Sequence, residues 1–327
     1  MKVRLAIATI SAVLAPAILT GCNDSTGPDT PLVWSTVANP ATWPLTGIWG
    51  TSSSDIWAVG WQGTMLHFNG ATWSRVTTGF GHTPIDVWAS SASDVWTVGT
   101  DGIVQDGLGF PTILHYDGTS WSIAASPALT SFSGIWGSSA SDVWAVGFGG
   151  VIIHYDGTSW SSVPSGTTAQ LTGVWGTSPS DVWAVGYQTI LHYDGTGWSS
   201  AASTSSYVDG VWGTSPSDVW AMSADVFRHY DGSHWTTFPS GLNADADVPV
   251  SIWGSSPSNV WVVTSTPGAL CCGKILRYDG TTWSIVPMGK QPNLNGTPNL
   301  NAIWGSSASD VWVVGDGGTL LHGTPAR

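Results

Sequence analysis

Histidine and aspartate are the side chains of this chain whose types and spacing could serve acid–base or metal chemistry. The sequence holds 8 His and 21 acidic residues, and every acid is Asp. Six of the histidines recur in one context, an apolar segment that precedes a Gly-containing turn: His67, His115, His154, His192, His229 and His322. A side chain repeated in this way favours a structural hydrogen bond, to an Asp of a nearby turn, over a catalytic or metal-binding role.

The acids divide into a repeated set and an unpatterned set. We expect the repeated ones to accept backbone N–H bonds in Asx-type turns. They are Asp55, Asp94, Asp117, Asp142, Asp156, Asp181, Asp194, Asp218, Asp231, Asp279 and Asp310. The unpatterned ones outside the N-terminal segment are Asp86, Asp101, Asp106, Asp209, Asp225, Asp245, Asp247 and Asp316. This second set suits a cation, a basic partner or solubility, and no calcium-loop spacing is present, so the sequence predicts no cofactor and leaves a bound cation open.

No catalytic motif accompanies these residues. The sequence has no G-x-S-x-G elbow, no metal-binding His pair and no Gly-rich phosphate loop. A glycosidase without Glu would need two Asp, and 8 Lys plus Arg are too few for the arginine cluster of a sialidase. A net charge of −13 repels phosphate backbones, so nucleic acid is excluded as a partner. The chain is predicted not to be an enzyme, with an Asp-based glycan-acting hydrolase as the alternative.

Tryptophan spacing shows which elements must position these side chains. The first repeated Trp is at Trp49, Trp88, Trp136, Trp175, Trp212, Trp253 and Trp304. The second follows eight residues later, at Trp57, Trp96, Trp144, Trp183, Trp220, Trp261 and Trp312. The third is at Trp73, Trp121, Trp160, Trp198, Trp235 and Trp283. The seventh repeat lacks this third Trp, and the segment around Trp34 near the N-terminus matches it.

Each repeat holds four short apolar segments separated by Gly, Asp-Gly or Ser-Asp turn signals, such as residues 45–50, 56–60, 64–68 and 72–77. Units of this kind predict propeller blades, and a last strand supplied by the N-terminus would close the ring and remove a free sheet edge. We therefore expect an all-β, seven-bladed β-propeller of four-stranded antiparallel blades over residues 32–322, closed by residues 32–38 and followed by a tail at 323–327. The Trp rings should pack between blades.

Loop lengths separate the two ends of such a propeller. The spacing across the first-to-second and third-to-fourth strand turns is constant, whereas the other links vary in length. This contrast is typical of a rigid frame that carries functional loops on one face. Asp86 replaces a small residue of the other repeats and should project toward the central channel, near His82. The candidate ligand-binding residues are Trp61, His82, Asp86, Asp101, Phe132, Tyr187, Tyr207, Asp209 and Asp225.

The N-terminus reads as an export signal. Basic residues precede an apolar run over 5–19, and Leu19-Thr20-Gly21-Cys22 follows. These four residues resemble the bacterial lipobox. The resemblance implies a signal peptide at 1–21, lipid on Cys22, a flexible tether at 22–31 and an anchor in the cell envelope, with Asn23 favouring the outer membrane. An ordinary secreted protein is the alternative. In an oxidising compartment Cys271 and Cys272 could form a vicinal disulfide, with free thiols or intermolecular pairing as alternatives.

The repeat as a whole resembles a known family. Its order, Asp-Val-Trp-Ala-Val-Gly and then Ile-Leu-His-Tyr-Asp-Gly-Thr-x-Trp, is similar to the BNR-like propellers of bacteria, including those similar to photosystem II assembly factors. The hairpins resemble the sialidase Asp-box, but Trp follows Asp one residue too early, so we interpret them as structural turns. Because this fold hosts enzymes, lectins and scaffolds, the resemblance does not fix the ligand. We expect a monomeric, lipid-anchored binding or scaffold module for a protein partner, with a glycan-binding, lectin-like propeller as the alternative.

Overall fold

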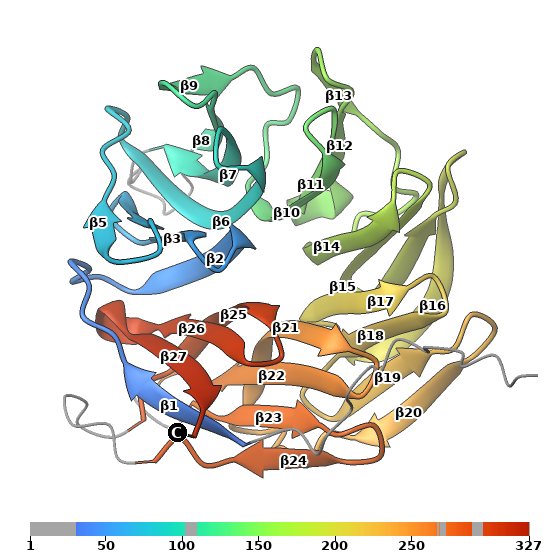
Figure 1. Cartoon of the computed structure of the whole chain (residues 1–327). Helices are drawn as coiled ribbons and strands as arrows, with labels where there is room; N and C mark the ends of the chain where they lie inside the picture. The colour runs from blue at the N-terminus through green and yellow to red at the C-terminus, as the bar shows by residue number, and fades with distance from the viewer. Residues whose placement is uncertain (1–30, 102–109, 267, 269–272, 290–296, 327) are drawn as a thin grey trace, which may run out of the picture. The chain divides into compact units, whose positions relative to one another are not determined.

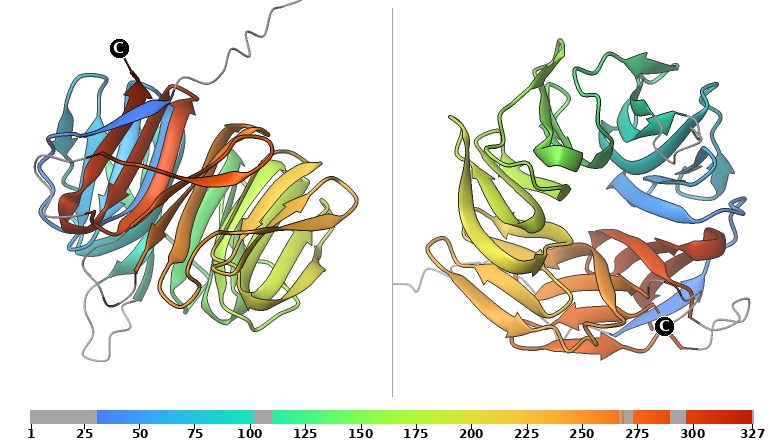
Figure 2. Two further views of the ribbon diagram at one scale, coloured as in Figure 1. Left: turned by 90° about the horizontal axis from the view of Figure 1, so that it is seen from below. Right: turned by 180° about the vertical axis from the view of Figure 1, so that it is seen from behind.

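The computed structural model describes residues 31–101, 110–266, 268, 273–289 and 297–326. These residues form seven antiparallel sheets arranged as blades around an axis (Figure 1), and within them no α-helix occurs. The all-β, seven-bladed propeller predicted from the sequence is confirmed. Viewed from below and from behind, the blades remain side by side as separate sheets (Figure 2).

The blades follow one another in chain order. Blades 1 to 3 consist of β2 (Leu45–Ser52), β3 (Asp55–Gly60), β4 (Thr64–Phe68) and β5 (Trp73–Arg75); β6 (His82–Ser91), β7 (Asp94–Asp101), β8 (Phe110–Tyr116) and β9 (Trp121–Ala124); and β10 (Phe132–Ser139), β11 (Asp142–Gly147), β12 (Ile152–Tyr155) and β13 (Trp160–Ser162). Blades 4 and 5 consist of β14 (Leu171–Ser178), β15 (Asp181–Tyr193) and β16 (Trp198–Tyr207); and β17 (Gly210–Ser215), β18 (Asp218–Met222), β19 (Val226–Tyr230) and β20 (Trp235–Pro239). Blades 6 and 7 consist of β21 (Val248–Ser256), β22 (Asn259–Ser265), β23 (Ile275–Tyr278) and β24 (Trp283–Val286); and β25 (Leu300–Ser307), β26 (Asp310–Gly315), β27 (Leu320–Pro325) and β1 (Leu32–Thr36). In blade 4 the single element β15 covers the second and third strand positions.

The second strand of each blade forms its core. In β3, Ile56, Trp57, Ala58 and Val59 are at most 4% exposed. The strand has a hydrogen-bonded neighbour on each side and a blade over each face, so both sets of alternating side chains are buried. This is why the sequence reads there as a continuous apolar run rather than as an alternating one.

Edge-to-face Trp pairs join the blades. Trp144 of blade 3 lies 5.5 Å from Trp198 of blade 4 with an interplanar angle of 81°. The other six interfaces carry the same pair: Trp57–Trp121, Trp96–Trp160, Trp183–Trp235, Trp220–Trp283, Trp34–Trp261 and Trp73–Trp312. Such pairs contribute roughly 0.5–1.5 kcal/mol beyond the area that they bury. The predicted inter-blade packing of the Trp residues is confirmed.

The first and last strands close the ring. β1 pairs with β27 from Leu32↔Pro325 to Thr36↔Leu321, and lies beside it at the rim of the propeller (Figure 1). This confirms closure by the N-terminal strand. It also shows that β27 continues to Pro325, so the predicted boundary at residue 322 falls inside the strand: the segment expected to be a tail is paired through Pro325.

The innermost strands pack through a Trp–Gly contact. The first-position Trp ring of one blade lies on the glycine that follows the equivalent Trp of the next blade. At Gly176 an added Cβ would lie 2.8 Å from Cη2 of Trp136, which a normal contact does not allow. In blade 2 this glycine is replaced by Ala89, and Trp49 instead donates its indole N–H to the Ala89 carbonyl at 3.0 Å.

Candidate functional site

One end of the propeller, called here the constant end, carries the first-to-second and third-to-fourth strand turns. There Nε2 of His154 lies 2.6 Å from Oδ1 of Asp142, whose other oxygen accepts from Ser138 at 2.5 Å. The imidazole stacks on Trp144 with centroids 4.1 Å apart. The same His–Asp pair recurs in six blades: Asp55–His67, Asp94–His115, Asp142–His154, Asp181–His192, Asp218–His229 and Asp310–His322. The predicted structural hydrogen bond of the histidines is confirmed.

Two kinds of aspartate turn are distinguished at this end. In the third-to-fourth strand turns, Oδ1 of Asp117 accepts the backbone N–H groups of Thr119 and Ser120, both at 2.8 Å, as predicted for an Asx-type turn. In the first-to-second strand turns that prediction is wrong in its main point, because the carboxylates are taken by His and Ser or Thr side chains. Burial raises the pKa of Asp142, but hydrogen bonds from His154 and Ser138 outweigh burial and hold the pKa below its ordinary value.

Blade 6 replaces this pair with a different one. Nε of Arg277 donates to Oδ1 of Asn259 at 2.8 Å, and the guanidinium lies 5.3 Å from the ring centroid of Trp261. The Asn259 amide donates in turn to Ser255 at 2.8 Å. A neutral acceptor, Asn259, and a permanent cation, Arg277, thus take the places of the Asp and the His. Blade 6 therefore shows the same contact without a carboxylate, and can be compared with the other six blades.

The opposite end, called here the variable end, carries the second-to-third strand links and the links between blades. Trp61, Phe148 and Tyr187 each follow the last glycine of a second strand and are 55%, 48% and 46% exposed. Phe110, at the start of β8, is 73% exposed. Aromatic side chains are therefore exposed on four consecutive blades at this end, where the repeat does not require them.

Tyr187 and Tyr207 form one aromatic patch of blade 4. They are opposite each other in the β15–β16 ladder, with ring centroids 5.0 Å apart. The Tyr207 hydroxyl donates to Oε1 of Gln170 at 3.1 Å. Gln188, next to Tyr187, has φ 57°, a left-handed conformation that is uncommon for a side chain of this kind. The two rings are thus held together on a tight turn and stay 46% and 42% exposed.

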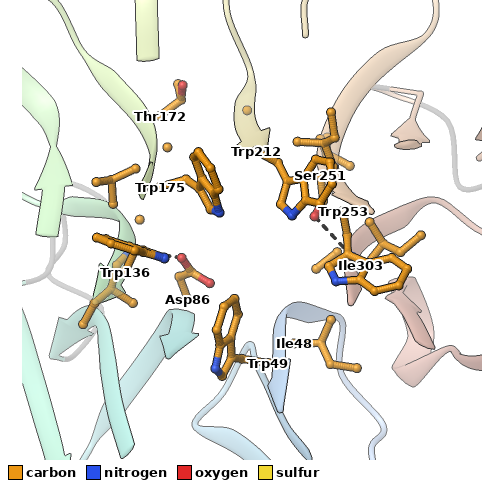
Figure 3. A pocket seen from close by; sticks show the side chains of 18 of the residues that line it. Ile48, Trp49, Asp86, Trp136, Thr172, Trp175, Trp212, Ser251, Trp253 and Ile303 are labelled. Carbon is orange, nitrogen blue, oxygen red and sulfur yellow. Dashed lines mark hydrogen bonds between the residues drawn. The ribbon is translucent and has the colours of Figure 1, made fainter. Parts of the chain in front are cut away.

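The first strands of all seven blades surround a central cavity of about 230 Å³. Trp136, Trp175, Trp212 and Trp253 lie around it, and Asp86 points into it (Figure 3). Trp175 and Trp212 are half-buried, whereas Trp136 is 7% exposed. Trp49 of blade 1 is half-buried as well, so the rings around the cavity differ in their exposure.

Asp86 joins two blades inside this cavity. Its Oδ1 accepts the amide of Val87 at 2.9 Å, and its Oδ2 accepts the amide of Ile135 in blade 3 at 3.1 Å. Burial raises the pKa of Asp86 to about 6, against the lowering effect of these two amides. Ser251 makes the equivalent contact in blade 6, where its hydroxyl accepts the amide of Ile303 at 3.2 Å. The expected projection of Asp86 toward the channel is thus what the structure shows.

Asp209 lines the same cavity from blade 5. Burial raises its pKa to about 7, with a further contribution from the negative charge of Asp225. Asp225 is exposed and accepts from Ser206 at 3.1 Å. Arg228 donates to Ser223 at 3.0 Å beside this pair. Two acids and one cation therefore meet where blade 5 borders the cavity.

Two candidate residues are buried rather than exposed. Phe132 is 0% exposed because it begins a first strand, at the position of Leu45, Leu171 and Leu300, whose side chains also lie in the core. His82 is 3% exposed and lies 3.1 Å from Thr97 Oγ1, and burial lowers its pKa to about 4. Their placement on the variable surface was wrong.

Other candidates lie outside the described part of the chain. These are Cys22, Cys271 and Cys272, together with the signal peptide and the tether. The backbone of Asp101 pairs with His82 at the end of β7, but its side chain is not described. Among the residues that are described, no group of three or more His, Cys, Asp or Glu could hold a metal ion. In the same residues no helix has the length and apolarity needed to cross a membrane.

Phe148 was not among the residues predicted from the sequence, although a signal for it is present. Aligning the repeats at the last glycine of the second strand places Trp61, Phe148 and Tyr187 at the same position, directly after Gly60, Gly147 and Gly186. The contact of Ser251 with the next blade was not predicted either, because a serine among small residues has no distinguishing pattern.

The comparisons with known proteins show a similarity of fold. No family model matches the chain, and no curated protein matches its sequence. YCF48 from Cyanidioschyzon merolae is similar in structure, with a TM-score of 0.69 and 17% identity over 90% of this chain and 100% of that chain. YCF48 bound to D1 peptide has a TM-score of 0.66 and 19% identity over 91% and 100% of the two chains. The GH74 xyloglucanase from Xanthomonas campestris has a TM-score of 0.67 and 12% identity over 88% of this chain and 53% of that chain. The chain thus shares its propeller fold with a photosystem II assembly factor, as the sequence resemblance implied, and with a hydrolase.

Proposed function

We propose that this chain is a non-catalytic binding or scaffold propeller that docks a protein partner on its variable end. One observation carries the proposal: exposed aromatic side chains occupy four consecutive blades at this end, on links that the repeat leaves free to vary. Large aromatic side chains are enriched where proteins meet and supply most of the binding energy there. The rings involved are Trp61, Phe110, Phe148, Tyr187 and Tyr207.

An extended partner fits this distribution better than a single sugar ring. The aromatics belong to separate blades, so a ligand that contacts several of them must span several links. A peptide-bound propeller is among the structures of similar fold, which supports this choice. The glycan-binding alternative rests on the Tyr187–Tyr207 pair, because flat exposed rings also stack on sugars.

The test compares two probes and two sets of variants. Binding partners are captured from envelope extract and binding to a glycan array is recorded, for the parent and for a Trp61→Ala, Tyr187→Ala, Tyr207→Ala variant. The matched control is Ile285→Ala, another large apolar side chain, 52% exposed on β24 and away from these links. Loss of a protein partner in the triple variant alone supports the proposal. Loss of glycan binding alone would support the lectin alternative, and no loss of either would refute docking at this end.

An Asp-based hydrolase is the second candidate, favoured by the Asp209–Asp225 pair. An acid with a raised pKa beside a second carboxyl group is what glycoside hydrolysis requires, and Asp209 has such a pKa. If the chain is such an enzyme, Asp209→Asn should abolish glycan cleavage and leave glycan binding in place. We propose that Asp86 is not a second acid of this kind, since both of its oxygens accept backbone amides.

We further propose export and lipid anchoring through Cys22. A Cys22→Ser variant should then be found unprocessed or in the soluble fraction, whereas the parent carries acyl chains detectable by mass spectrometry. Cleavage elsewhere and an absence of acyl chains in the parent would refute the anchor.

A further inference from the structure

The first strands direct one row of backbone amides into the central cavity. The amide of Ile135 donates to Asp86, and the amide of Ile303 donates to Ser251. In an antiparallel edge strand, alternate residues direct their N–H groups away from the paired strand. Val174 and Val211 occupy the same register as Ile135, because each of the three pairs with the alanine of the next strand (Ile135↔Ala145, Val174↔Ala184, Val211↔Ala221). Their N–H groups therefore face the cavity too.

Asp86 shows that these amides can bind a carboxylate. One carboxylate accepts the amide of the next residue, Val87, and the amide of the next blade, Ile135, at 2.9 and 3.1 Å. Hydrogen bonds to an ionised acceptor are roughly twice as strong as neutral ones. The first strands of blades 2 and 3 thus hold two carboxylate oxygens with their backbone amides.

Gly173 leaves the equivalent place empty in blade 4. It occupies the position of Asp86 in the repeat, so a carboxylate there would meet the amides of Val174 and Val211. A Cβ added to Gly173 would lie no closer than 3.7 Å to any neighbour, and its φ is not in the left-handed region. Neither packing nor backbone conformation requires glycine. In the described part of the chain no side chain accepts a hydrogen bond from the amide of Val174 or Val211.

The exposure of Gly173 and the side chains around it are compatible with a bound ligand. Of the four glycines at this repeat position, Gly47, Gly134 and Gly210 are buried, and Gly173 is half-buried. Half-buried Trp175 and Trp212 border it, with ring centroids 6.4 Å apart. Asp209 is nearby on the cavity wall, and its pKa of about 7 leaves it partly protonated at neutral pH, which lessens its repulsion of a bound anion.

We propose that the central cavity binds a carboxylate group over Gly173, held by the amides of Val174 and Val211 as Asp86 is held by those of Val87 and Ile135. The ligand is a small carboxylic acid or a carboxylate at the end of a peptide chain. This site does not depend on docking at the variable end, and either proposal can fail without the other.

The direct test follows the two amides in solution. The parent, labelled with ¹⁵N-valine, is titrated with potassium acetate, with potassium chloride and acetamide as controls at matched concentration. Acetate should shift the Val174 and Val211 amide resonances in a saturable way, and the controls should not. Equal shifts with acetamide would refute selectivity for a carboxylate, and no shift with acetate would refute the site.

A pair of charge-matched variants separates filling of the site from a general charge effect. Gly173→Asp supplies the carboxylate from the chain and should weaken acetate binding at least tenfold. Gly197→Asp adds the same charge on a hairpin where an added Cβ meets nothing within 4 Å, and should leave the affinity within twofold. Equal affinities in the two variants would overturn the proposal.

Chemical rescue tests the Asp86 site, whose amides are the model for the proposed one. It keeps the proposal falsifiable if Gly173→Asp fails to fold. Asp86→Gly removes the internal carboxylate and should lower the melting temperature, and acetate should restore part of this loss while chloride does not. Absence of rescue would show that these amides do not hold a free carboxylate. Triglycine and its C-terminal amide then identify the source: tighter binding of triglycine than of acetate or the amide indicates a peptide chain end, and equal binding of triglycine and acetate indicates a small acid.

Discussion

The two ends of the propeller use aspartate for opposite purposes. At the constant end, Asp142 and its equivalents bind a histidine and a hydroxyl side chain, and their pKa lies below the ordinary value. In the central cavity, Asp86 and Asp209 are desolvated and no basic side chain among the described residues lowers their pKa values, which rise to about 6 and 7. Hydrogen bonding therefore favours the ionised form of the residue in one region, and burial disfavours it in the other.

The difference shows where the repeat is under structural constraint. A position that recurs around the ring serves the frame, as the edge-to-face Trp pairs do between blades and the Trp-stacked histidines do within a blade. Trp61 and Asp209 depart from the repeat and take no part in these recurring contacts, and Asp86 adds a contact between blades 2 and 3 that the repeat does not require. The departures are therefore the places to look for function.

The largest expected effect comes from opening the ring, since both ends depend on it. Deleting residues 31–40 removes β1 and leaves β27 without its outer neighbour. We expect aggregation or a fall in the free energy of unfolding of several kcal/mol, because Trp34, 5% exposed and packed on Trp261, is lost as well. Urea unfolding and light scattering measure this, with Trp34→Ala as the milder variant. A truncated chain that unfolds like the parent would refute closure by β1.

A smaller effect on stability is expected from removing carboxylates at the constant end. Replacing Asp142, Asp181 and Asp218 by Ala leaves three partly buried histidines without their acceptor. Each loss should cost roughly 1–3 kcal/mol of unfolding free energy. Partner binding by the folded protein should not change. The matched control is Asn259→Ala in blade 6, which removes an uncharged acceptor from Arg277.

The two ends should also respond to pH in opposite directions. For Asp142 and its equivalents the folded pKa is depressed, so their stabilisation is present above the unfolded pKa of 3.8 and is lost as pH falls below it. For Asp209 the folded pKa is raised to about 7, so stability decreases as pH rises from about 4 to 7. Urea unfolding from pH 3 to 8 should show both slopes. Asp209→Asn should reduce only the second, leaving the part due to Asp86, whose pKa is raised to about 6, and a slope unchanged by this substitution would contradict the assignment.

Most of the fold could be predicted from the sequence, because each blade contact repeats seven times. The Trp positions alone indicated the number of blades, the closing strand and the packing between blades. The His–Asp pair was also predictable, since both residues recur at corresponding strand and turn positions in six repeats. Sequence reasoning worked least well where a residue is unique. Phe132 and His82 were expected on the surface, but alignment with Leu45 places Phe132 in the core, and burial of His82 depends on Thr97 of the neighbouring strand. The amides of Val174 and Val211 carry no sequence signal at all, because only the register of the strands directs them into the cavity.

The smallest effect on stability, and the largest on binding, is expected from the aromatic side chains of the variable end. Trp61, Tyr187 and Tyr207 are 55%, 46% and 42% exposed, so their replacement by Ala removes little buried area. Surface substitutions of this kind usually change unfolding free energy by less than about 0.5 kcal/mol each, although Tyr207 also gives up its hydrogen bond to Gln170. Affinity for the docked partner should nevertheless fall at least tenfold, because exposed aromatic rings supply much of the binding energy of an interface. Titration calorimetry with the captured partner measures the affinity, and urea unfolding measures the stability of the same variant. If affinity falls instead with the Asp142, Asp181 and Asp218 set while the aromatic set binds normally, the functional end of the propeller is the constant one, and the departures from the repeat do not mark the binding surface.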